Sequence, residues 1–262
     1  MNMVEYASLQ RIDCNRQGRD YVVGDVHGCF ARLERLLQQL DFDRDRDRLF
    51  AVGDLIDRGP DSAAVVDWLQ APWFHAICGN HEAMLLDSVW VADGRLQWGD
   101  HSALWFANGG GWFFDLASAQ QRTVHHAVAS LPLALQVALP AGGSAALVHA
   151  DVIDDSWPAT CAALAAPSDA QRMQLLWSRQ RAEQAMALQT RQARSVDVTG
   201  VDVIFFGHTP MAAPRRVGNT RWIDTGAVFG GDLSIAALQG DGDVWRLPAS
   251  GGMESLDWSP RR

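Results

Sequence analysis

Three short apolar runs in the first third of the chain each lead into a polar cluster that begins with glycine. The runs cover residues 21–23, 49–52 and 73–78, and the clusters begin at Gly24-Asp25, Gly53-Asp54 and Gly79-Asn80. After the first run, leucines recur at helical spacing at positions 33, 36, 37 and 40. This pattern predicts strands alternating with helices, in which parallel strands deliver their loop residues to one edge of the sheet, where ligands bind.

The remaining pattern predicts further elements along the chain. Helices are expected over 63–69 with Ser62 as the cap, over 82–91, through most of 93–130 and over 169–180. Strands are expected at 133–139 and 144–148, as a hairpin around 140–143, and at 201–206, 221–223, 233–238 and 244–247. The last two are joined by Gly240-Asp241-Gly242, and the C-terminal strands predict a second sheet packed against the first. The polar segment 181–199 is interpreted as a mobile loop, and Trp112, Phe113 and Phe114 as core residues.

Length and composition favour a single domain. The chain has 262 residues, of which 48% are hydrophobic, and this is enough for one well-buried core. We expect one domain over residues 1–262, with a motif-bearing core at about 20–240 and a frayed tail from about 249. The net charge of −9 and the pI of about 5.2 argue against a general nucleic-acid binder.

The cysteines indicate a reducing compartment. Cys14, Cys29, Cys78 and Cys161 form neither a C-x-x-C pair nor a zinc-ribbon spacing, so we expect free thiols. Residues 1–20 contain no apolar signal-peptide region, and no stretch approaches the roughly 18 apolar residues of a membrane span. We therefore expect a cytoplasmic protein that binds neither membranes nor nucleic acid, in which Cys29 and Cys78 are inert.

Six short segments carry the side chains that indicate chemistry. They are G-D-V-H-G from Gly24, G-D-L-I-D-R-G from Gly53, G-N-H-E from Gly79, V-H-A from Val148, W-S-R from Trp177 and G-H-T-P from Gly207. They supply six candidate metal ligands, namely Asp25, His27, Asp54, Asn80, His149 and His208. Mixed nitrogen and oxygen donors suit manganese, iron or zinc, whereas a thiolate site would need cysteines. We expect two divalent ions, with manganese as the first choice.

The spacing of these residues assigns them to two ions. Asp25 and His27 are two apart, so at a strand end both side chains project to the same side and can reach one ion. Asp54 follows the neighbouring strand, and a carboxylate there can bridge two ions with its two oxygens. Two ions about 3.5–4 Å apart can hold a bridging hydroxide and polarise a phosphoryl group for in-line attack.

Four more residues complete the predicted catalytic site. His81 directly follows Asn80 and can protonate the leaving alkoxide as a general acid. Asp57 can orient His81 and raise its pKa. Arg58 and Arg179 can hold phosphate oxygens through bidentate forks, although Arg181 is close enough in sequence to compete with Arg179 for that role.

These segments resemble the calcineurin-like metallophosphoesterases and, within them, the PPP-type serine/threonine protein phosphatases. The chain is most similar to the small bacterial and bacteriophage lambda-type branch, through N-G-G-G-W-F-F at Asn108, H-A-D at His149, W-S-R-Q-R at Trp177, F-G-H-T-P at Phe206 and D-T-G-A-V-F at Asp224. The resemblance covers about 21–238. It implies an α/β fold (α+β by some schemes), a four-layer β-sandwich flanked by α-helices with the site at one edge. It also implies that Asp25 and His27 hold the first metal, that Asp54 bridges, and that Asn80, His149 and His208 hold the second.

The implied activity is hydrolysis of phosphoserine and phosphothreonine in proteins, with phosphotyrosine and small aryl phosphates as further substrates. A symmetrical diadenosine polyphosphate hydrolase of the same superfamily is the alternative, but such relatives usually carry G-N-H-D where this chain has Glu82. A nucleotide phosphodiesterase is a weaker alternative. A binding protein with a degenerate site is disfavoured, because every proposed ligand and the proposed acid are present.

Overall fold

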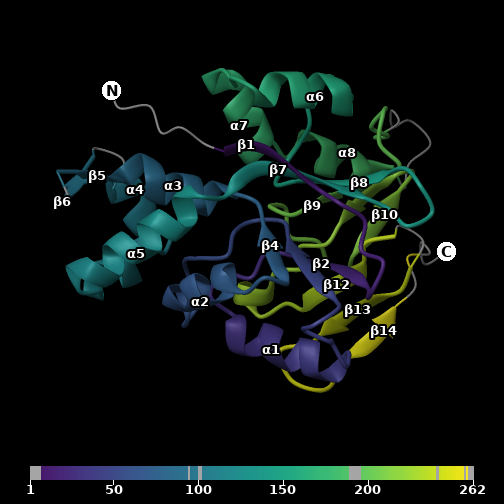
Figure 1. Ribbon diagram of the computed structural model, residues 1–262, viewed down its shortest axis with the longest axis horizontal. Helices are drawn as coiled ribbons and strands as arrows, with labels where there is room; N and C mark the ends of the chain where they lie inside the picture. The colour runs from purple at the N-terminus through teal and green to yellow at the C-terminus, as the bar shows by residue number, and fades with distance from the viewer. Residues whose placement is uncertain are drawn as a thin grey trace.

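Two six-stranded sheets form the centre of the computed structural model, which describes residues 7–93, 95–99, 102–188, 196–239, 242–256 and 258 (Figure 1). The first sheet has the order β14-β13-β12-β2-β3-β4 and the second the order β1-β7-β8-β9-β11-β10. In Figure 1 the helices α1 and α2 lie below the sheets, α6 and α7 above them, and α3, α4 and α5 to the left.

The first sheet is built on the three apolar runs. Its strands are β2 (Asp20–Val23), β3 (Arg48–Ala51), β4 (Phe74–Ala76), β12 (Leu233–Ala237), β13 (Val244–Leu247) and β14 (Glu254–Leu256). β2, β3 and β4 run parallel, as predicted. β12 pairs antiparallel with β2, with Ile235 opposite Val23. The assignment of all C-terminal strands to a second sheet is therefore wrong for β12 and β13, because their apolar faces extend the first sheet.

The second sheet contains the predicted hairpin. Its strands are β1 (Ala7–Ile12), β7 (Pro132–Ala138), β8 (Ser144–Val148), β9 (Val203–Phe206), β10 (Arg215–Val217) and β11 (Thr220–Trp222). β7 and β8 pair antiparallel, and β9 lies parallel to both β8 and β11. β1 adds an edge strand parallel to β7 that the sequence pattern did not predict.

The core alternates between two layers along each central strand. Val22 and Phe50 are fully buried against Leu135, Leu147 and Phe205 of the other sheet. The neighbouring positions on the same strands point the opposite way, toward the helices. Because successive strand residues face opposite sides, this alternation places apolar layers both between the sheets and under the helices. The predicted four-layer sandwich is confirmed.

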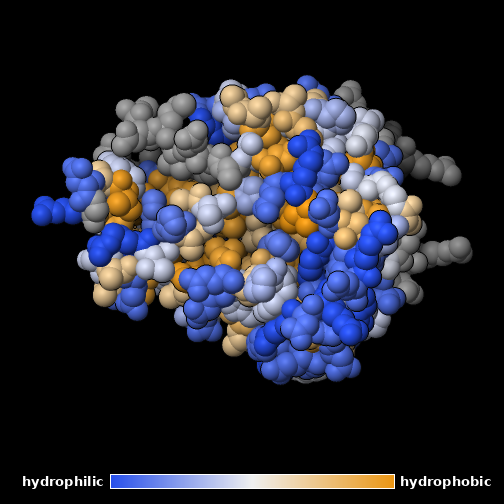
Figure 2. Space-filling model, in the orientation of Figure 1, coloured by the Kyte–Doolittle hydropathy of each residue, from blue (hydrophilic) through white to orange (hydrophobic). Residues whose placement is uncertain are grey.

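The first helices frame the loops that follow the strands. They are α1 (Phe30–Gln39), the 3₁₀ turn η1 (Ser62–Ala64) and α2 (Val65–Gln70). The surface over α1 is hydrophilic (Figure 2), as expected for the outer face of a helix whose inner face buries Leu33, Leu36 and Leu37. Ser62 does not cap a helix as predicted, because its hydroxyl accepts a hydrogen bond from the Asp57 backbone N–H at 2.9 Å.

The segment after β4 departs from the predicted helix at both ends. The elements are α3 (Asn80–Ser88), β5 (Val89–Ala92), β6 (Arg95–Trp98), α4 (Ser102–Ala107), η2 (Gly110–Asp115) and α5 (Ser118–Ala129). The expected continuation of α3 to residue 91 is wrong, because Val89 and Val91 instead belong to an antiparallel hairpin with β6. Phe113 is fully buried, but Phe114 is 43% exposed and is not a core residue.

The second half of the chain contains more regular structure than predicted. Its helices are α6 (Trp157–Leu164), α7 (Asp169–Trp177), α8 (Gln180–Ala187) and the 3₁₀ turn η3 (Ala227–Phe229). The mobile loop predicted over 181–199 is wrong for 181–187, where α8 buries Arg181, Ala182 and Ala185; residues 189–195 lie outside the described residues.

The C-terminal tail is partly ordered. The expected fraying from residue 249 is wrong for Glu254–Leu256, which pair with β13, and for Trp258, which is 7% exposed. The turn predicted at 240–242 lies mostly outside the described residues. None of the helices in the described part of the chain has the length and apolar character needed to cross a bilayer.

Candidate active site

The six predicted metal ligands lie at one edge of the two sheets. Asp25 and His27 follow β2, Asp54 follows β3, and Asn80 opens α3, the helix that follows β4. His149 and His208 follow β8 and β9 of the other sheet. All six side chains are buried. The parallel pairing of β2, β3 and β4 explains the convergence, because their carboxyl ends point to the same edge.

Four donor atoms come together around Asn80. Its Oδ1 lies 2.9 Å from His149 Nε2 and 2.9 Å from His208 Nδ1. His149 Nε2 is also 3.4 Å from Asp54 Oδ1. These atoms, two oxygens and two nitrogens, form a donor set of the type that manganese, iron and zinc accept.

The outer nitrogens of these two histidines are held by backbone carbonyls. His149 Nδ1 donates to the Val52 carbonyl at 2.7 Å, and His208 Nε2 donates to the Trp177 carbonyl at 3.0 Å. Such hydrogen bonds fix the tautomer and leave the other nitrogen free as a ligand. Burial lowers the pKa of His149 and that of His208, the latter to about 3, so both rings are neutral near pH 7.

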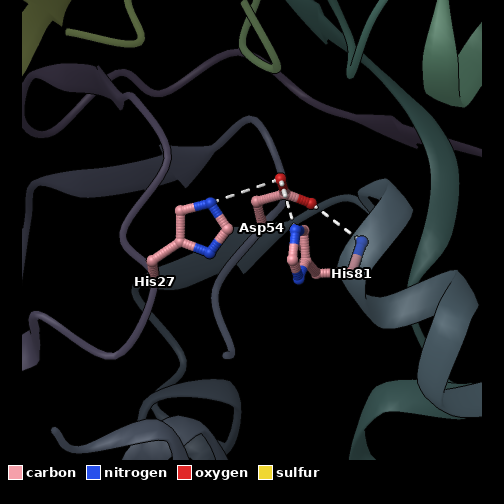
Figure 3. A group of neighbouring side chains, drawn as sticks. All are labelled: His27, Asp54 and His81. Carbon is pink, nitrogen blue, oxygen red and sulfur yellow. Dashed lines mark hydrogen bonds and ion pairs between the residues drawn. The ribbon is translucent and has the colours of Figure 1, made fainter. Parts of the chain in front are cut away.

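His27 approaches Asp54 Oδ2, the carboxylate oxygen that His149 does not approach (Figure 3). Its Nε2 is 3.5 Å from Asp54 Oδ2, while its Nδ1 donates to the Ile56 carbonyl at 2.9 Å. Burial lowers the pKa of His27 to about 4. Its Nε2 also accepts a hydrogen bond from Arg58 Nη1 at 2.7 Å, so the ligand nitrogen of this histidine has a protein partner.

Asp25 points to a different neighbour. Its carboxylate accepts the His208 backbone N–H at 3.0 Å. Among the described residues the converging donors form two groups, one of His27, Asp54 and His81 and one of Asp54, His149 and His208, and Asp25 belongs to neither. Burial, and then the charges of Asp224 and Asp54, raise the pKa of Asp25 well above its ordinary value. Asp224 is a buried acid whose pKa burial raises to about 6, and sequence reasoning gave it no role.

His81 has one nitrogen fixed and one free. Its Nδ1 donates to Asp57 Oδ2 at 2.7 Å, and its backbone N–H donates to Asp54 Oδ1 at 3.0 Å. Its Nε2 is buried and lies 4.0 Å from Asp54 Oδ2, with which it forms an ion pair when protonated (Figure 3), and it has no hydrogen-bond partner among the described residues. Burial alone would lower the pKa of His81, but the charge of Asp54 and the contact with Asp57 outweigh it and raise the pKa.

Two indole N–H groups hold the Asp57 carboxylate. Sequence reasoning interpreted Trp112 only as a core residue and gave Trp105 no role. Trp105 Nε1 donates to Asp57 Oδ2 and Trp112 Nε1 to Asp57 Oδ1, each at 2.8 Å. Asp57 is fully buried, so these donors and His81 replace the water that a carboxylate needs. The sequence signal available for Trp112 was its place directly after the three glycines of the N-G-G-G-W-F-F segment.

Glu82 is another residue whose role sequence reasoning missed. Its two buried oxygens accept the backbone N–H groups of Asp54, Leu55, Ile56 and Gly79 at 2.8–3.2 Å. It therefore ties the loop after β3 to the start of α3. Burial and the charge of Asp54 raise the pKa of Glu82 to about 7.

The two predicted phosphate-binding arginines lie at the surface of the site. Arg58 is exposed, and its guanidinium carbon lies 5.1 Å from the centre of the Phe229 ring. Arg179 is exposed at the N-cap of α8, and its positive charge helps to lower the pKa of His149 and His208. Arg181, the competing residue, is instead buried in ion pairs with acids of the neighbouring loop.

The backbone of the site is strained at several of these positions. His27, Asp54, Asp57, Arg58 and His208 all have positive φ, between 45° and 73°. Residues other than glycine rarely adopt this backbone conformation, and it recurs at functional sites where the surrounding structure enforces it. The glycines beside them permit close packing: a Cβ on Gly79 would lie 2.3 Å from Asp54 Oδ1.

The chain is similar to known proteins in sequence and in fold. The sequence profile described as "Calcineurin-like phosphoesterase" matches residues 21–212. Serine/threonine-protein phosphatase 1 of Salmonella typhimurium is 37% identical over 233 residues, which is 88% of this chain and 96% of that protein. A symmetrical bis(5'-nucleosyl)-tetraphosphatase of a Shewanella species is 52% identical, but over only 68 residues, 25% of each chain.

A solved structure shows the same fold. The crystal structure of a putative diadenosine tetraphosphatase superposes with a TM-score of 0.60 and 24% sequence identity, and the match covers 94% of this chain and 100% of that chain.

Proposed function

Because the chain belongs to the calcineurin-like phosphoesterases, we propose that it removes phosphate from phosphoserine and phosphothreonine in proteins, with phosphotyrosine and small aryl phosphates as further substrates. The near full-length similarity to a named serine/threonine-protein phosphatase supports this choice within the family.

The observation that carries the proposal is the free nitrogen of His81. Among the described residues this buried nitrogen has no hydrogen-bond partner, and it lies 4.0 Å from Asp54 Oδ2, an arrangement that suits a proton donor waiting for a leaving group. Asp57 holds the opposite nitrogen and so fixes which nitrogen faces the site.

The donor atoms fit two divalent ions. We propose that Asp25 and His27 hold the first, that Asn80, His149 and His208 hold the second, and that Asp54 bridges them. When bound, such a pair activates water and polarises the phosphoryl group. We propose manganese as the native metal, on the chemistry of the mixed oxygen and nitrogen donors.

The protein residues then perform the remaining steps. Arg58 and Arg179, exposed at the rim of the site, bind phosphate oxygens and orient the ester for in-line displacement. His81 gives the proton on Nε2 to the departing serine or threonine oxygen, and the imidazole later regains a proton from water. Asp57 holds the ring and stabilises its charged form.

We also propose a cytoplasmic location. All four cysteines are free thiols, as expected in a reducing compartment.

Side-by-side hydrolysis of a phosphothreonine peptide and of diadenosine tetraphosphate tests the proposal. Metal-free protein is assayed with and without Mn²⁺. We expect Mn²⁺-dependent release of phosphate from the peptide and little cleavage of the dinucleotide. The reverse preference would favour the tetraphosphatase activity suggested by the short nucleotidase match. Metal binding without hydrolysis of either substrate would contradict the proposed activity.

A further inference from the structure

Arg181 is a buried arginine that joins three segments beside the site. Its side chain lies in the first turn of α8, and the residue is 4% exposed. Its Nε donates to Asp151 Oδ1 at 2.6 Å and its Nη1 to the Val196 carbonyl at 2.8 Å, while its Nη2 donates to Asp155 Oδ1. These acceptors use the donors of the planar guanidinium group. Arg181 therefore has a structural role and is not available to bind an anion.

Asp151 extends this ion pair to two metal-ligand histidines. It lies two residues after His149, and its Oδ2 accepts the Ser178 hydroxyl at 3.1 Å. Ser178 directly follows Trp177, whose carbonyl oxygen accepts the Nε2–H of His208 at 3.0 Å. The loop after β8 and the turn between α7 and α8 are thereby tied together through one buried carboxylate.

Arg179 lies on the turn that this network holds. It follows Ser178 and precedes the helix that carries Arg181. A buried carboxylate that loses its cationic partner is strongly disfavoured and must find other donors or water. Loss of the Arg181 guanidinium would therefore change the hydrogen bonding of Asp151, release Ser178 and shift the turn.

We propose that Arg181 is a positioning residue, which acts through Asp151 and Ser178 to place Arg179 for phosphate binding. This rests on the proposed function in so far as Arg179 binds the substrate phosphate. Displacement of a binding group by about 1 Å is enough to cost up to about 10²-fold.

The test compares manganese-loaded wild type with Arg181→Met, Arg181→Lys and Ser178→Ala. Calorimetry measures the Kd of inorganic phosphate, and kinetics with a phosphothreonine peptide give kcat and KM separately. We expect Arg181→Met to raise both Kd and KM by about 10-fold and to lower kcat by less than about 3-fold. Arg181→Lys should recover part of the loss, because an ammonium group can still pair with Asp151. Ser178→Ala should raise Kd by about 3-fold.

A double variant separates positioning from direct binding. In an Arg179→Ala background, Arg181→Met should not weaken phosphate binding further, because the group that it positions is already gone. Arg46→Met is the matched control. Arg46 forms a 3.8 Å ion pair with Asp43 at the surface, in which its side chain is 67% exposed, so its removal should leave Kd and KM unchanged.

Three results would overturn the inference. They are a folded Arg181→Met protein with wild-type Kd and KM, multiplying losses in the double variant, and wild-type Kd in Arg179→Ala. If Arg181→Met does not fold, Ser178→Ala decides the same question, since it removes only one hydroxyl. Cleavage of a dinucleotide in place of the peptide would contradict the proposed substrate alone, because the Kd of inorganic phosphate still reports on Arg181.

Discussion

The metal-donor atoms on the two sides of Asp54 are preorganised to different extents. On the side of Asn80, His149 and His208, the donor atoms already converge at 2.9 Å, and the outer nitrogen of each ring is held by a carbonyl. On the side of His27, the ligand nitrogen accepts a hydrogen bond from Arg58. Asp25 there is engaged with the His208 backbone N–H.

This difference has a thermodynamic consequence. An ion that enters the Asn80 side displaces few protein contacts, whereas an ion that enters the His27 side must displace the guanidinium of Arg58. We therefore expect the two ions to bind in order, with the Asn80 side filled first. The same exchange would free Arg58 to turn toward a substrate phosphate, so metal occupancy and phosphate binding would be coupled.

Replacement of Asp54, whose carboxylate both sides share, should have the largest effect on metal content and activity. In Asp54→Asn the amide has one oxygen in place of two equivalent charged ones, so it cannot bridge two ions. We expect loss of at least one ion per chain and a fall in kcat/KM of about 10³-fold or more, measured by elemental analysis and phosphatase assay. Retention of two ions per chain in this variant would show that Asp54 is not the bridge.

Substitution of His81 tests whether the His27 side of the site contains a general acid in addition to metal ligands. His81→Ala should retain wild-type metal content but lower kcat for a phosphothreonine peptide by about 10²–10³-fold, with much less effect on p-nitrophenyl phosphate, whose leaving group needs no proton. Equal turnover of both esters at wild-type rates would refute the general-acid role. A matching loss of metal would instead make His81 a ligand.

The pH dependence of kcat provides a second test of His81 as the general acid. A general acid acts only when protonated, so kcat for the peptide falls as pH rises through its pKa. Burial lowers the pKa of His81, whereas the hydrogen bond to Asp57 raises it and so moves this alkaline limb to higher pH. Asp57→Asn removes one of the charges that raise the pKa and should move the limb to lower pH. An unmoved limb would assign it to another group.

Sequence reasoning predicted the sheet edge well because local signals determine it. Each of the parallel strands β2, β3 and β4 is followed by a glycine and a polar residue, and this places Asp25, Asp54 and Asn80 together without knowledge of distant contacts. The sandwich followed from the family resemblance. By contrast, the membership of β12 in the first sheet depends on pairing with β2, more than two hundred residues earlier, which no local pattern encodes.

The site residues that sequence reasoning missed also depend on contacts with residues distant in sequence. Glu82 and Trp105 act through hydrogen bonds to backbone and side chains that are 26–48 residues away in sequence. Arg181 appeared to belong to a polar loop, because a buried arginine is distinguishable from a solvated one only when its acidic partners are placed around it. Tertiary partners, and not residue type, determine these roles.

Arg58 offers the finest test of the comparison, because one substitution should have opposite effects on two ligands. In Arg58→Met the methionine cannot donate to His27 Nε2, so the ligand nitrogen is free and a nearby positive charge is gone. We expect the weaker Mn²⁺ to bind about 3–10-fold more tightly by calorimetry, while KM for a phosphothreonine peptide rises about 10-fold because a phosphate ligand is lost. The tighter Mn²⁺ site should remain unchanged, since its donors are already assembled around Asn80. If both sites tightened equally, a general charge effect would explain the change, and the proposed order of filling would lose its basis.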